Sequence, residues 1–284
     1  MTRVLLTGAA GQLGTDTQRA AEDVPGIELL AHDRESLDIT DAANTNQVIA
    51  AAAPSVIIHG AAWTAVDHCE GDEARSFAVN STGTKNVLDA AKSVGARVIY
   101  VSTDYVFDGT KSDPYVESDT PNPASVYGRS KLAGEAATLA DPENLVVRTS
   151  WVCSAHGSNM VKTILRLAES HPTLTFVDDQ IGKPTFTADL GASLLTLAQR
   201  NDTGVMHITN EGVVSWYEFC QDVLRAAGLD PERVMPCSTD ELQPPRPAPR
   251  PANSVLANTR FAGLGLDLLR DFRAPLAEVV AELI

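Results

Sequence analysis

Short apolar runs rich in Val, Ile and Leu alternate along this chain with longer, Ala-rich segments whose apolar positions recur at helical spacing. A continuous apolar run of this kind is typical of a strand buried on both faces, as in a parallel sheet covered by helices. The strands are expected at Val4–Leu6, Glu28–Ala31, Val56–His59, Val98–Ser102, Leu145–Arg148, Leu174–Val177 and Val205–Ile208. The helices are expected near residues 12–22, 41–53, 72–94, 125–139, 158–170, 187–200 and 215–227. The pattern predicts an α/β fold with a doubly wound parallel sheet of the Rossmann type.

The regular alternation fades after about residue 150, which predicts a smaller C-terminal lobe built differently from the sheet. Within this part lies a Pro-rich stretch from Pro244 to Pro251. Because proline fixes φ and removes backbone donors, the stretch is expected to be extended. It is either an inert linker or a stiff arm over a pocket, and the helical pattern that resumes afterwards favours the arm.

Composition narrows the class of protein. With 284 residues the chain can bury a substantial core, and its formal net charge of −15 opposes binding to nucleic acid or to an acidic membrane surface. The N-terminus enters a strand pattern at once, without a signal-like segment, and we expect a cytoplasmic protein with no membrane span. The widely spaced cysteines favour a reducing compartment, and all are expected to be small buried side chains: Cys69, Cys153, Cys220 and Cys237.

A glycine-rich turn, Thr7-Gly8-Ala9-Ala10-Gly11-Gln12-Leu13-Gly14, joins the first predicted strand to the first helix. Glycine there lets the backbone approach a pyrophosphate and leaves the helix N-terminus pointing at its negative charge. A lone glycine run is often only a tight turn, but an acidic residue, Asp33, stands at the end of the second strand, where dinucleotide sites carry one. Together they predict a dinucleotide site that includes Gly8, Gly11, Gln12, Leu13 and Asp33.

The type of dinucleotide is left open by two neighbouring residues. Asp33 can accept hydrogen bonds from the ribose hydroxyls of NADH, whereas Arg34 can pair with the 2′-phosphate of NADPH, so either cofactor is expected. Further residues at strand ends are expected beside the nucleotide, although ordinary packing explains each of them equally well when taken alone: Asp38, Ile39, Ala61 and Ala62.

Tyr127 and Lys131 are four residues apart and share one face of a predicted helix. A Tyr that gives a proton to a carbonyl near neutral pH needs a lowered pKa, which a neighbouring ammonium provides by favouring the phenolate. This spacing occurs often by chance, with an exposed surface pair as the plain alternative. The hydroxyls of Ser102 and Thr103, at the end of the preceding strand, would lie beside that helix and favour a catalytic group of Thr103, Tyr127 and Lys131.

In combination, the fold pattern, glycine turn, strand-end hydroxyls and YxxxK spacing resemble the extended short-chain dehydrogenase/reductase superfamily. Within it, the chain resembles the dTDP-4-dehydrorhamnose reductase family over nearly its whole length. The segments that carry this resemblance are Ala62–Asp67, Ser102–Phe107, Arg148–Val152, Asp179–Thr185 and Arg250–Leu256.

The resemblance implies NAD(P)H-dependent reduction of the C4 keto group of dTDP-4-dehydro-β-L-rhamnose, the last step of dTDP-rhamnose synthesis. It adds Thr64, Ser102, Tyr127 and Lys131 to the cofactor contacts. The implied substrate contacts are Thr64, Val66, Thr103, Asp104, Tyr105, Tyr127, Trp151, Arg250 and Asn253, with Arg250 and Asn253 at the diphosphate. For Trp151 a place in the core is the alternative. It also implies an NAD(P)-binding domain at residues 1–152 and a substrate-binding lobe made mostly of residues 153–284, with some segments returning to the sheet.

Three alternatives stand beside this interpretation. A sugar-nucleotide dehydratase would carry an Asp-Glu pair after the Thr, whereas Asp104 is followed by Tyr105. An epimerase would share the fold and the YxxxK spacing but not the matched segments. A non-catalytic subunit, like the regulatory subunit of methionine adenosyltransferase, would have no use for the intact Thr103, Tyr127 and Lys131.

Some reductases of this kind hold Mg²⁺ between carboxylates at a dimer interface. Asp16 and Glu282 stand near the corresponding positions, but the third is Ala188, next to Asp189. With one of the hard oxygen ligands missing, a strong Mg²⁺ site is doubtful, and no spaced histidine pair favours zinc. A monomer or a weak homodimer is expected, with a dTDP-4-keto sugar as its small-molecule partner.

Overall fold

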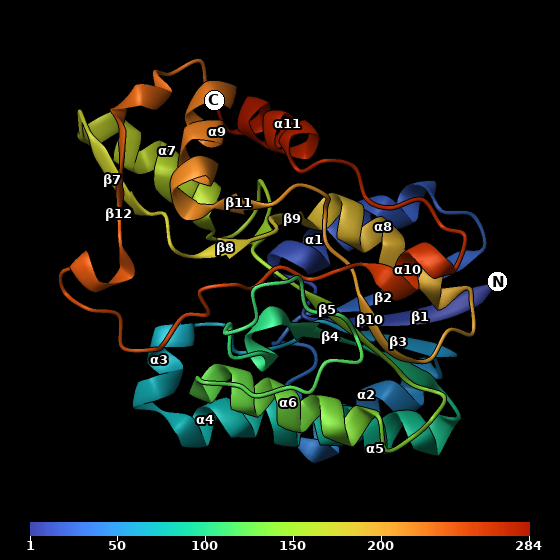
Figure 1. Ribbon diagram of the computed structural model, residues 1–284. Helices are drawn as coiled ribbons and strands as arrows, with labels where there is room; N and C mark the ends of the chain where they lie inside the picture. The colour runs from blue at the N-terminus through green and yellow to red at the C-terminus, as the bar shows by residue number, and fades with distance from the viewer.

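A six-stranded parallel sheet forms the larger part of the computed structural model, which describes residues 1–284 (Figure 1). Its strands lie in the order β10-β5-β4-β3-β1-β2. Their bounds are β1 (Thr2–Thr7), β2 (Ile27–His32), β3 (Val56–His59), β4 (Arg97–Thr103), β5 (Leu145–Thr149) and β10 (Gly204–His207). Because β1 lies between β2 and β3, the winding reverses there, and a ligand crevice is expected outside the carboxyl ends of these strands. The predicted doubly wound parallel sheet is confirmed.

Helices cover both faces of the sheet (Figure 1). One face carries α1 (Gln12–Asp23) and α8 (Thr187–Ala198), and the other carries α2 (Ala42–Ala52), α5 (Thr84–Val94) and α6 (Val126–Thr138). Alternate side chains of each strand point to opposite faces, so Val4 and Leu6 pack toward α8 whereas Leu5 packs toward α2 and α5. Because both faces of each strand are buried, the strands appear in the sequence as unbroken runs of apolar residues.

The segment between β3 and α5 departs from the prediction. A single helix near residues 72–94 was expected, but the chain forms α3 (Val66–Gly71), α4 (Glu73–Phe77) and a π-helical turn η1 (Ala78–Gly83) before α5. The π turn contains Asn80, which is fully buried and hydrogen-bonds to the backbone of Trp63 and to Ser130. Widened turns of this kind are frequent at functional sites, and apolar periodicity does not reveal them.

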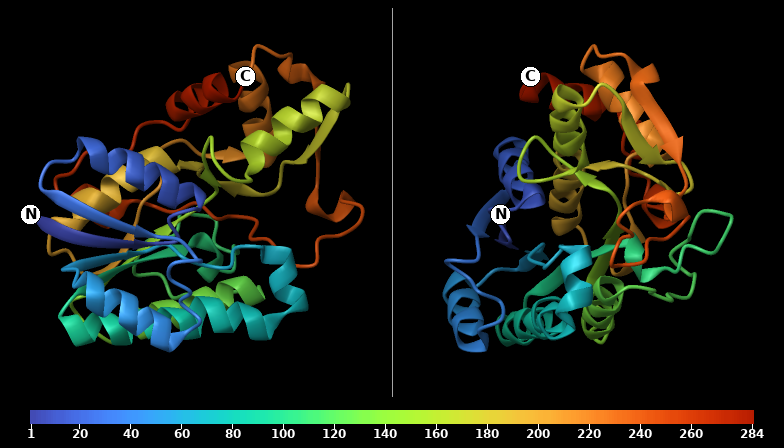
Figure 2. Two further views of the ribbon diagram at one scale, coloured as in Figure 1. Left: turned by 180° about the vertical axis from the view of Figure 1, so that it is seen from behind. Right: turned by 90° about the vertical axis from the view of Figure 1, so that its left-hand side faces the viewer.

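The second lobe is built from α7 (Met160–Ser170), α9 (Trp216–Ala226) and α11 (Arg273–Leu283), which share an apolar cluster around Phe186, Phe219 and Phe272. The predicted strand Leu174–Val177 is β7 and belongs to this lobe, where it pairs with β12 (Val234–Cys237). Two shorter pairs join β6 (Val152–Cys153) to β9 (Thr185–Phe186) and β8 (Ile181–Gly182) to β11 (Val214–Ser215). Figure 2 shows the lobe on one side of the sheet, displaced away from the N-terminus.

Residues of the second half also return to the sheet. Strand β10 pairs with β5, α8 packs on α1, and the short α10 (Thr259–Gly263) packs on β10. Single 3-10 turns lie at η2 (Asp104–Val106), η3 (Pro231–Arg233) and η4 (Thr239–Glu241). No helix has both the length and the apolar character needed to span a bilayer.

The Pro-rich stretch between Pro244 and Pro251 contains neither helix nor strand and runs from the second lobe down to α3 (Figure 1). Its Ala248 N–H donates to the Asp67 carboxylate of α3 at 3.2 Å. The stretch therefore bridges the two parts of the molecule, as the interpretation as an arm requires.

The four cysteines are all free thiols. The expectation of burial is confirmed for Cys69, Cys153 and Cys220 but is wrong for Cys237, which is only half-buried. Cys237 ends β12, whose partner β7 covers it from one side, and this strand lies at the surface of the lobe.

Candidate active site

The glycine turn lies where the winding of the sheet reverses. Gly8 has φ +77°, and a Cβ at this position would lie 2.9 Å from the backbone N of Ala61. Only glycine therefore lets the turn after β1 pack against the end of β3. Helix α1 then begins at Gln12, and Gly11 at its N-cap supplies no side-chain hydrogen bond, so the first backbone N–H groups are free to bind an anion.

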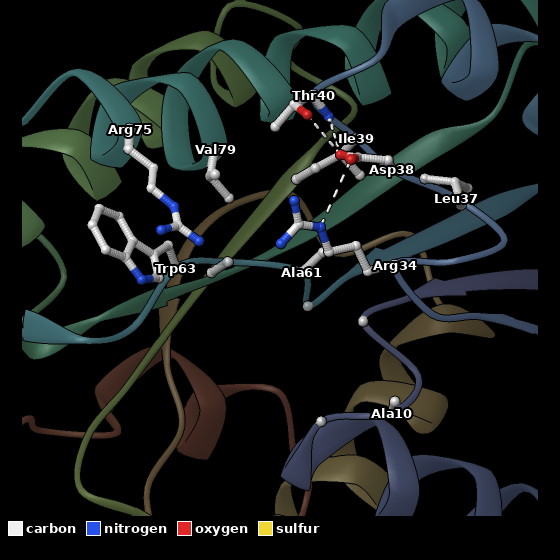
Figure 3. A pocket seen from close by; sticks show the side chains of 14 residues that line it. Ala10, Arg34, Leu37, Asp38, Ile39, Thr40, Ala61, Trp63, Arg75 and Val79 are labelled. Atoms are coloured by element: carbon white, nitrogen blue, oxygen red, sulfur yellow. Dashed lines mark hydrogen bonds and ion pairs between the residues drawn. The ribbon is translucent and has the colours of Figure 1, made fainter. Parts of the chain in front are cut away.

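A cavity of about 280 Å³ opens beside this turn (Figure 3). Seven of the residues predicted to bind cofactor line it: Gly8, Gly11, Arg34, Asp38, Ile39, Ala61 and Ala62. Leu37, Ile39 and Val79 give it an apolar wall suited to a purine base. The glycine cradle and this wall fit the adenosine half of a nicotinamide dinucleotide.

Asp33 does not line this cavity but belongs to a neighbouring depression with Ala9, Gln18 and Ser36. Its Oδ1 accepts hydrogen bonds from the backbone N–H groups of Glu35 and Ser36 and from the Ser36 hydroxyl. These bonds, from Ser36 above all, lower the pKa of Asp33 below its ordinary value. In the structure, one oxygen of the carboxylate predicted to bind ribose is thus occupied by its own turn.

A second cavity, of about 500 Å³, continues from the glycine turn to the end of β4. It brings together residues that are far apart in the sequence and that were predicted for cofactor, substrate or catalysis: Gly8, Gly11, Gln12, Leu13, Ala62, Thr64, Val66, Ser102, Thr103, Asp104, Tyr105, Tyr127, Lys131 and Trp151. We call it the reaction cavity. It also contains Ser158, Met160 and Trp216 of the second lobe, which sequence reasoning missed.

Thr103, Tyr127 and Lys131 converge on the reaction cavity from β4 and α6. Ser125 caps α6 by accepting from the Gly128 N–H at 3.1 Å, and the helix then carries Tyr127 and Lys131 on one face. Lys131 Nζ donates to the Val101 carbonyl at 2.8 Å and lies 4.1 Å from the centre of the Tyr100 ring. Thr103 Oγ1 donates to Asp104 Oδ1 at 2.9 Å.

Burial is the largest influence on the pKa values of Lys131 and Tyr127. It lowers the pKa of Lys131 to about 7, against the opposing pull of Glu135 one turn along α6. Burial also raises the pKa of Tyr127 above its ordinary value, while a hydrogen bond with Thr103 acts in the other direction. The sequence argument expected Lys131 to lower the pKa of Tyr127, but the desolvation of the phenol outweighs any such effect in this structure.

Asp104 is also buried, and burial raises the pKa of its carboxyl to about 6 in spite of the hydrogen bond from Thr103. Its Oδ2 has no hydrogen-bond partner within the protein. This oxygen is closed off from solvent, and the Ser254 hydroxyl is the side-chain group besides Thr103 that acts to lower the pKa of the carboxyl.

The far end of the reaction cavity leads into a third cavity of about 580 Å³, which shares Tyr105, Met160 and Trp216 with it. The third cavity lies between α7 and β7 of the lobe and the Pro-rich arm, which contributes Arg246 and Arg250. This cavity was not predicted. Its residues carry no motif, because the walls are single side chains from separate elements.

Arg250, predicted to meet a diphosphate, lies at the edge of the third cavity and is held by Asp67. Both of its terminal nitrogens donate to that carboxylate, with Nη2 to Oδ2 at 2.8 Å, and Arg246 lies 3.9 Å from the same group. The Arg250 hydrogen bond is the main reason that the pKa of Asp67 lies below its ordinary value. Asn253 lines none of the three cavities, since its amide donates to the backbone carbonyls of Lys111 and Asp113.

Trp151 has an unusual backbone for a non-glycine residue, with φ +45°. Its indole stacks on Trp216, the ring centroids being 3.5 Å apart and the planes 5° apart. Gly182 lies directly against the same indole, and a Cβ there would collide with it. The pair forms an aromatic wall between the reaction cavity and the lobe, so Trp151 has both the packing role and the cavity position that its sequence context left open.

Gln12 links the glycine turn to the second lobe. Its side chain donates to the Ser158 carbonyl at 3.2 Å and accepts from Asn159 at 2.9 Å. Asn159 is the N-cap of α7, the helix that walls the third cavity. The glycine turn and the second lobe are thus in direct contact.

The carboxylates considered for Mg²⁺ have other partners. Asp16 is buried and accepts from the hydroxyls of Ser154 and Thr187, Glu282 pairs with Arg19, and Asp189 pairs with Arg270. No group of three acidic, histidine or cysteine side chains is placed to hold a metal ion.

A doubly wound sheet, a glycine turn at its switch point and a Thr-Tyr-Lys group in the adjoining cavity define a reductase of the extended short-chain dehydrogenase type. The chain belongs to the family described as RmlD substrate binding domain, whose model matches residues 1–284. This confirms the family resemblance drawn from the motifs.

Known relatives are similar to this chain over nearly its whole length. A Mycobacterium tuberculosis protein named dTDP-4-dehydrorhamnose reductase is 45% identical over 98% of this chain and 92% of its own. The solved structure of a dTDP-4-dehydrorhamnose reductase from Clostridium acetobutylicum has 40% identity and a TM-score of 0.94, with 99% of each chain covered. The Bacillus anthracis dTDP-4-dehydrorhamnose reductase, solved in complex with NADP, has 34% identity and a TM-score of 0.92, again with 99% of each chain covered.

Proposed function

We propose that this protein reduces the C4 keto group of dTDP-4-dehydro-β-L-rhamnose to the hydroxyl of dTDP-β-L-rhamnose, with NADPH or NADH as reductant. The observation that carries the proposal is the reaction cavity, in which Thr103, Tyr127 and Lys131 open directly onto the crevice of the glycine turn. The relatives named dTDP-4-dehydrorhamnose reductase, which are similar over nearly their full length, support the choice of sugar.

When bound, the reduced nicotinamide supplies a hydride to the carbonyl carbon. The carbonyl oxygen then needs a proton, and Tyr127 holds one at neutral pH because burial keeps its phenol protonated. Thr103 lies beside Tyr127, and its hydroxyl would turn from Asp104 to donate a hydrogen bond to the carbonyl oxygen. Lys131, anchored to the Val101 carbonyl, has a pKa near 7 and can return a proton to Tyr127. One hydride and one proton convert the carbonyl to an alcohol.

The shape of the site suggests how the sugar nucleotide lies. The sugar would occupy the reaction cavity against Thr64, Val66, Asp104, Tyr105 and Trp151. The nucleoside would extend past Trp216 into the third cavity, which places the diphosphate near Arg250. Asn253 would not contact the substrate itself and would act only by holding the loop of Lys111 and Asp113 through its side-chain amide.

Oxidation of NADPH and of NADH, followed at 340 nm with and without the dTDP-4-keto sugar, tests the proposal. Sugar-dependent oxidation is expected with both cofactors. A folded protein that binds a dinucleotide but oxidises none of it in the presence of the sugar would instead be a binding subunit, such as the regulatory subunit of methionine adenosyltransferase.

The organisation predicted from the sequence completes the proposal. Residues 1–152 would bind the cofactor and residues 153–284 would mostly bind the substrate. The protein would act in the cytoplasm as a monomer or weak homodimer, without nucleic acid or membrane as a partner and without a strong Mg²⁺ site.

A further inference from the structure

Two arginines face the cavity of about 280 Å³ beside the glycine turn, here called the adenosine cavity, from opposite sides (Figure 3). Arg34 follows β2, and Arg75 belongs to α4, far along the chain. Figure 3 shows their guanidinium groups turned toward one another across the mouth of the cavity. Sequence reasoning considered Arg34 alone, because no other basic residue lies in the glycine turn.

The two guanidinium groups share a cavity lining with a single carboxylate, that of Asp38. Arg75 has no carboxylate within 4.0 Å, and the ion pair of Arg34 is with Asp38, at 3.7 Å from its Nε. Asp38 is itself held by Thr40, whose N–H and hydroxyl both donate to Oδ1. In a chain of net charge −15, the cavity therefore presents an excess of positive charge.

The position of Arg75 is supported by its neighbours. Its guanidinium carbon lies 4.6 Å from the centre of the Trp63 ring, a cation–π distance. The backbone of Trp63 is fixed in turn, because its N–H and its C=O both bond to the side-chain amide of Asn80, at 2.8 and 3.1 Å. Asn80 is fully buried in the π-helical turn. The π turn, Trp63 and Arg75 thus form one supported assembly at the cavity mouth.

We propose that Arg75 is a second determinant of cofactor choice, which together with Arg34 clamps the 2′-phosphate of NADPH. The inference rests on the proposed function, since it requires a nicotinamide dinucleotide in this crevice. The apolar wall of Leu37, Ile39 and Val79 takes the adenine, and the glycine turn takes the pyrophosphate. An anion at the adenosine ribose then lies at the mouth where Arg34 points, and Arg75 faces the same space.

Arginine suits this task because its planar fork of donors matches phosphate oxygens, and a charge-assisted hydrogen bond is stronger than a neutral one. NADH has only ribose hydroxyls at this place and offers no anion to Arg75. The clamp therefore favours NADPH and leaves the binding of NADH nearly unchanged.

Titration calorimetry with adenosine 2′,5′-bisphosphate and with 5′-AMP tests the clamp, because the two probes differ only in the 2′-phosphate and need no turnover. We expect Arg75→Gln to weaken binding of the bisphosphate about tenfold to hundredfold and to change binding of 5′-AMP by less than about twofold. Arg75→Lys should keep part of the bisphosphate affinity. The matched control is Arg166→Gln, which removes an equal charge from an exposed position on α7 that lines none of the three cavities.

Retained 5′-AMP binding shows that the variant still folds around an intact cavity. Equal losses for both probes would overturn the proposal, because they would place Arg75 on the base or the 5′-phosphate, and unchanged affinities would overturn it as well. Failure of the proposed function looks different: the unmodified protein would bind the bisphosphate more tightly than 5′-AMP yet oxidise no NADPH with the keto sugar.

Discussion

At the scale of single residues, the reaction cavity is governed by the removal of water from charged groups. Burial makes the neutral form more favourable for Lys131, Asp104 and Tyr127 alike. The result is an acid, Tyr127, that stays protonated, next to an amine that changes its charge near neutral pH. Each group can therefore be tested by a substitution that preserves its shape.

Tyr127→Phe removes the phenolic oxygen and nothing else. We expect kcat to fall by at least about a hundredfold, the lower range for a positioned acid, while binding of NADPH stays close to that of the unmodified protein. Steady-state kinetics and calorimetry on the same preparation measure both quantities. A folded variant with near-normal turnover would exclude Tyr127 as the proton donor.

Asp104→Asn tests the buried carboxyl by linkage. The pKa of Asp104 is about 6 in the folded protein, above the ordinary value of 3.8. Between these two pH values the folded protein therefore binds more protons than the unfolded protein. Ionisation of Asp104 thus lowers the free energy of unfolding as pH rises through this range. Asn never ionises, so the stability of the variant relative to the unmodified protein should improve by about 1–3 kcal/mol between pH 4 and pH 7. Urea unfolding at each pH measures the difference.

Asp108→Asn is the matched control with the opposite sign. Hydrogen bonds from the Thr110 backbone, first among several donors, hold the pKa of Asp108 well below its ordinary value. Ionised Asp108 therefore adds stability that is present at neutral pH and lost on acidification, and its replacement should become more harmful as pH rises. The same trend for both variants would contradict the assignment for Asp104.

At the scale of elements, regular segments and short motifs could be predicted, and contacts between distant segments could not. The strands of the sheet and helices such as α1 and α6 follow from periodicity, and the glycine turn and YxxxK group are each contained in a few adjacent residues. Strands β6, β8, β9 and β11 have two residues each, too few to show a period. The pairing of Asp67 with Arg250, and the entry of Trp216 and Arg75 into the cavities, depend on the folded chain alone.

The Pro-rich arm is the element whose role is most open to test. Arg250→Ala should raise the KM for the sugar nucleotide much more than the KM for NADPH, because the arm borders the third cavity and not the adenosine cavity. Asp67→Asn should give a smaller rise with the same selectivity and should increase hydrogen exchange at the backbone amides of Arg246, Ala248 and Arg250. Equal effects on both KM values would mean that the arm is only a linker.

At the scale of the whole molecule, the two halves of the chain do not fold as separate layers. The apolar cluster beneath α1 draws Leu190, Leu194 and Met206 from the second half, and β10 completes the edge of the sheet beside β5. The division proposed at residue 152 therefore concerns binding roles and does not mark a boundary between independent cores.

A fragment of residues 1–152 should consequently fail to fold. It would leave the β5 edge unpaired and expose the apolar face that α8 covers, so we expect aggregation or a circular dichroism spectrum without cooperative melting. Co-expression with residues 153–284 should restore a soluble, cooperatively melting complex. A fragment 1–152 that melts cooperatively alone would show that the first half holds a sufficient core.

The bonds of Gln12 to Ser158 and Asn159 have a kinetic consequence. A dinucleotide seated on the glycine turn restrains Gln12, and through Asn159 it restrains the first turn of α7, so part of the entropy of ordering the sugar-nucleotide cavity is lost before the sugar arrives. The sugar nucleotide then binds to a cavity in which the first turn of α7 is already ordered. We therefore expect an ordered sequence of encounters, in which the reductant enters first and the reduced sugar departs before the spent dinucleotide.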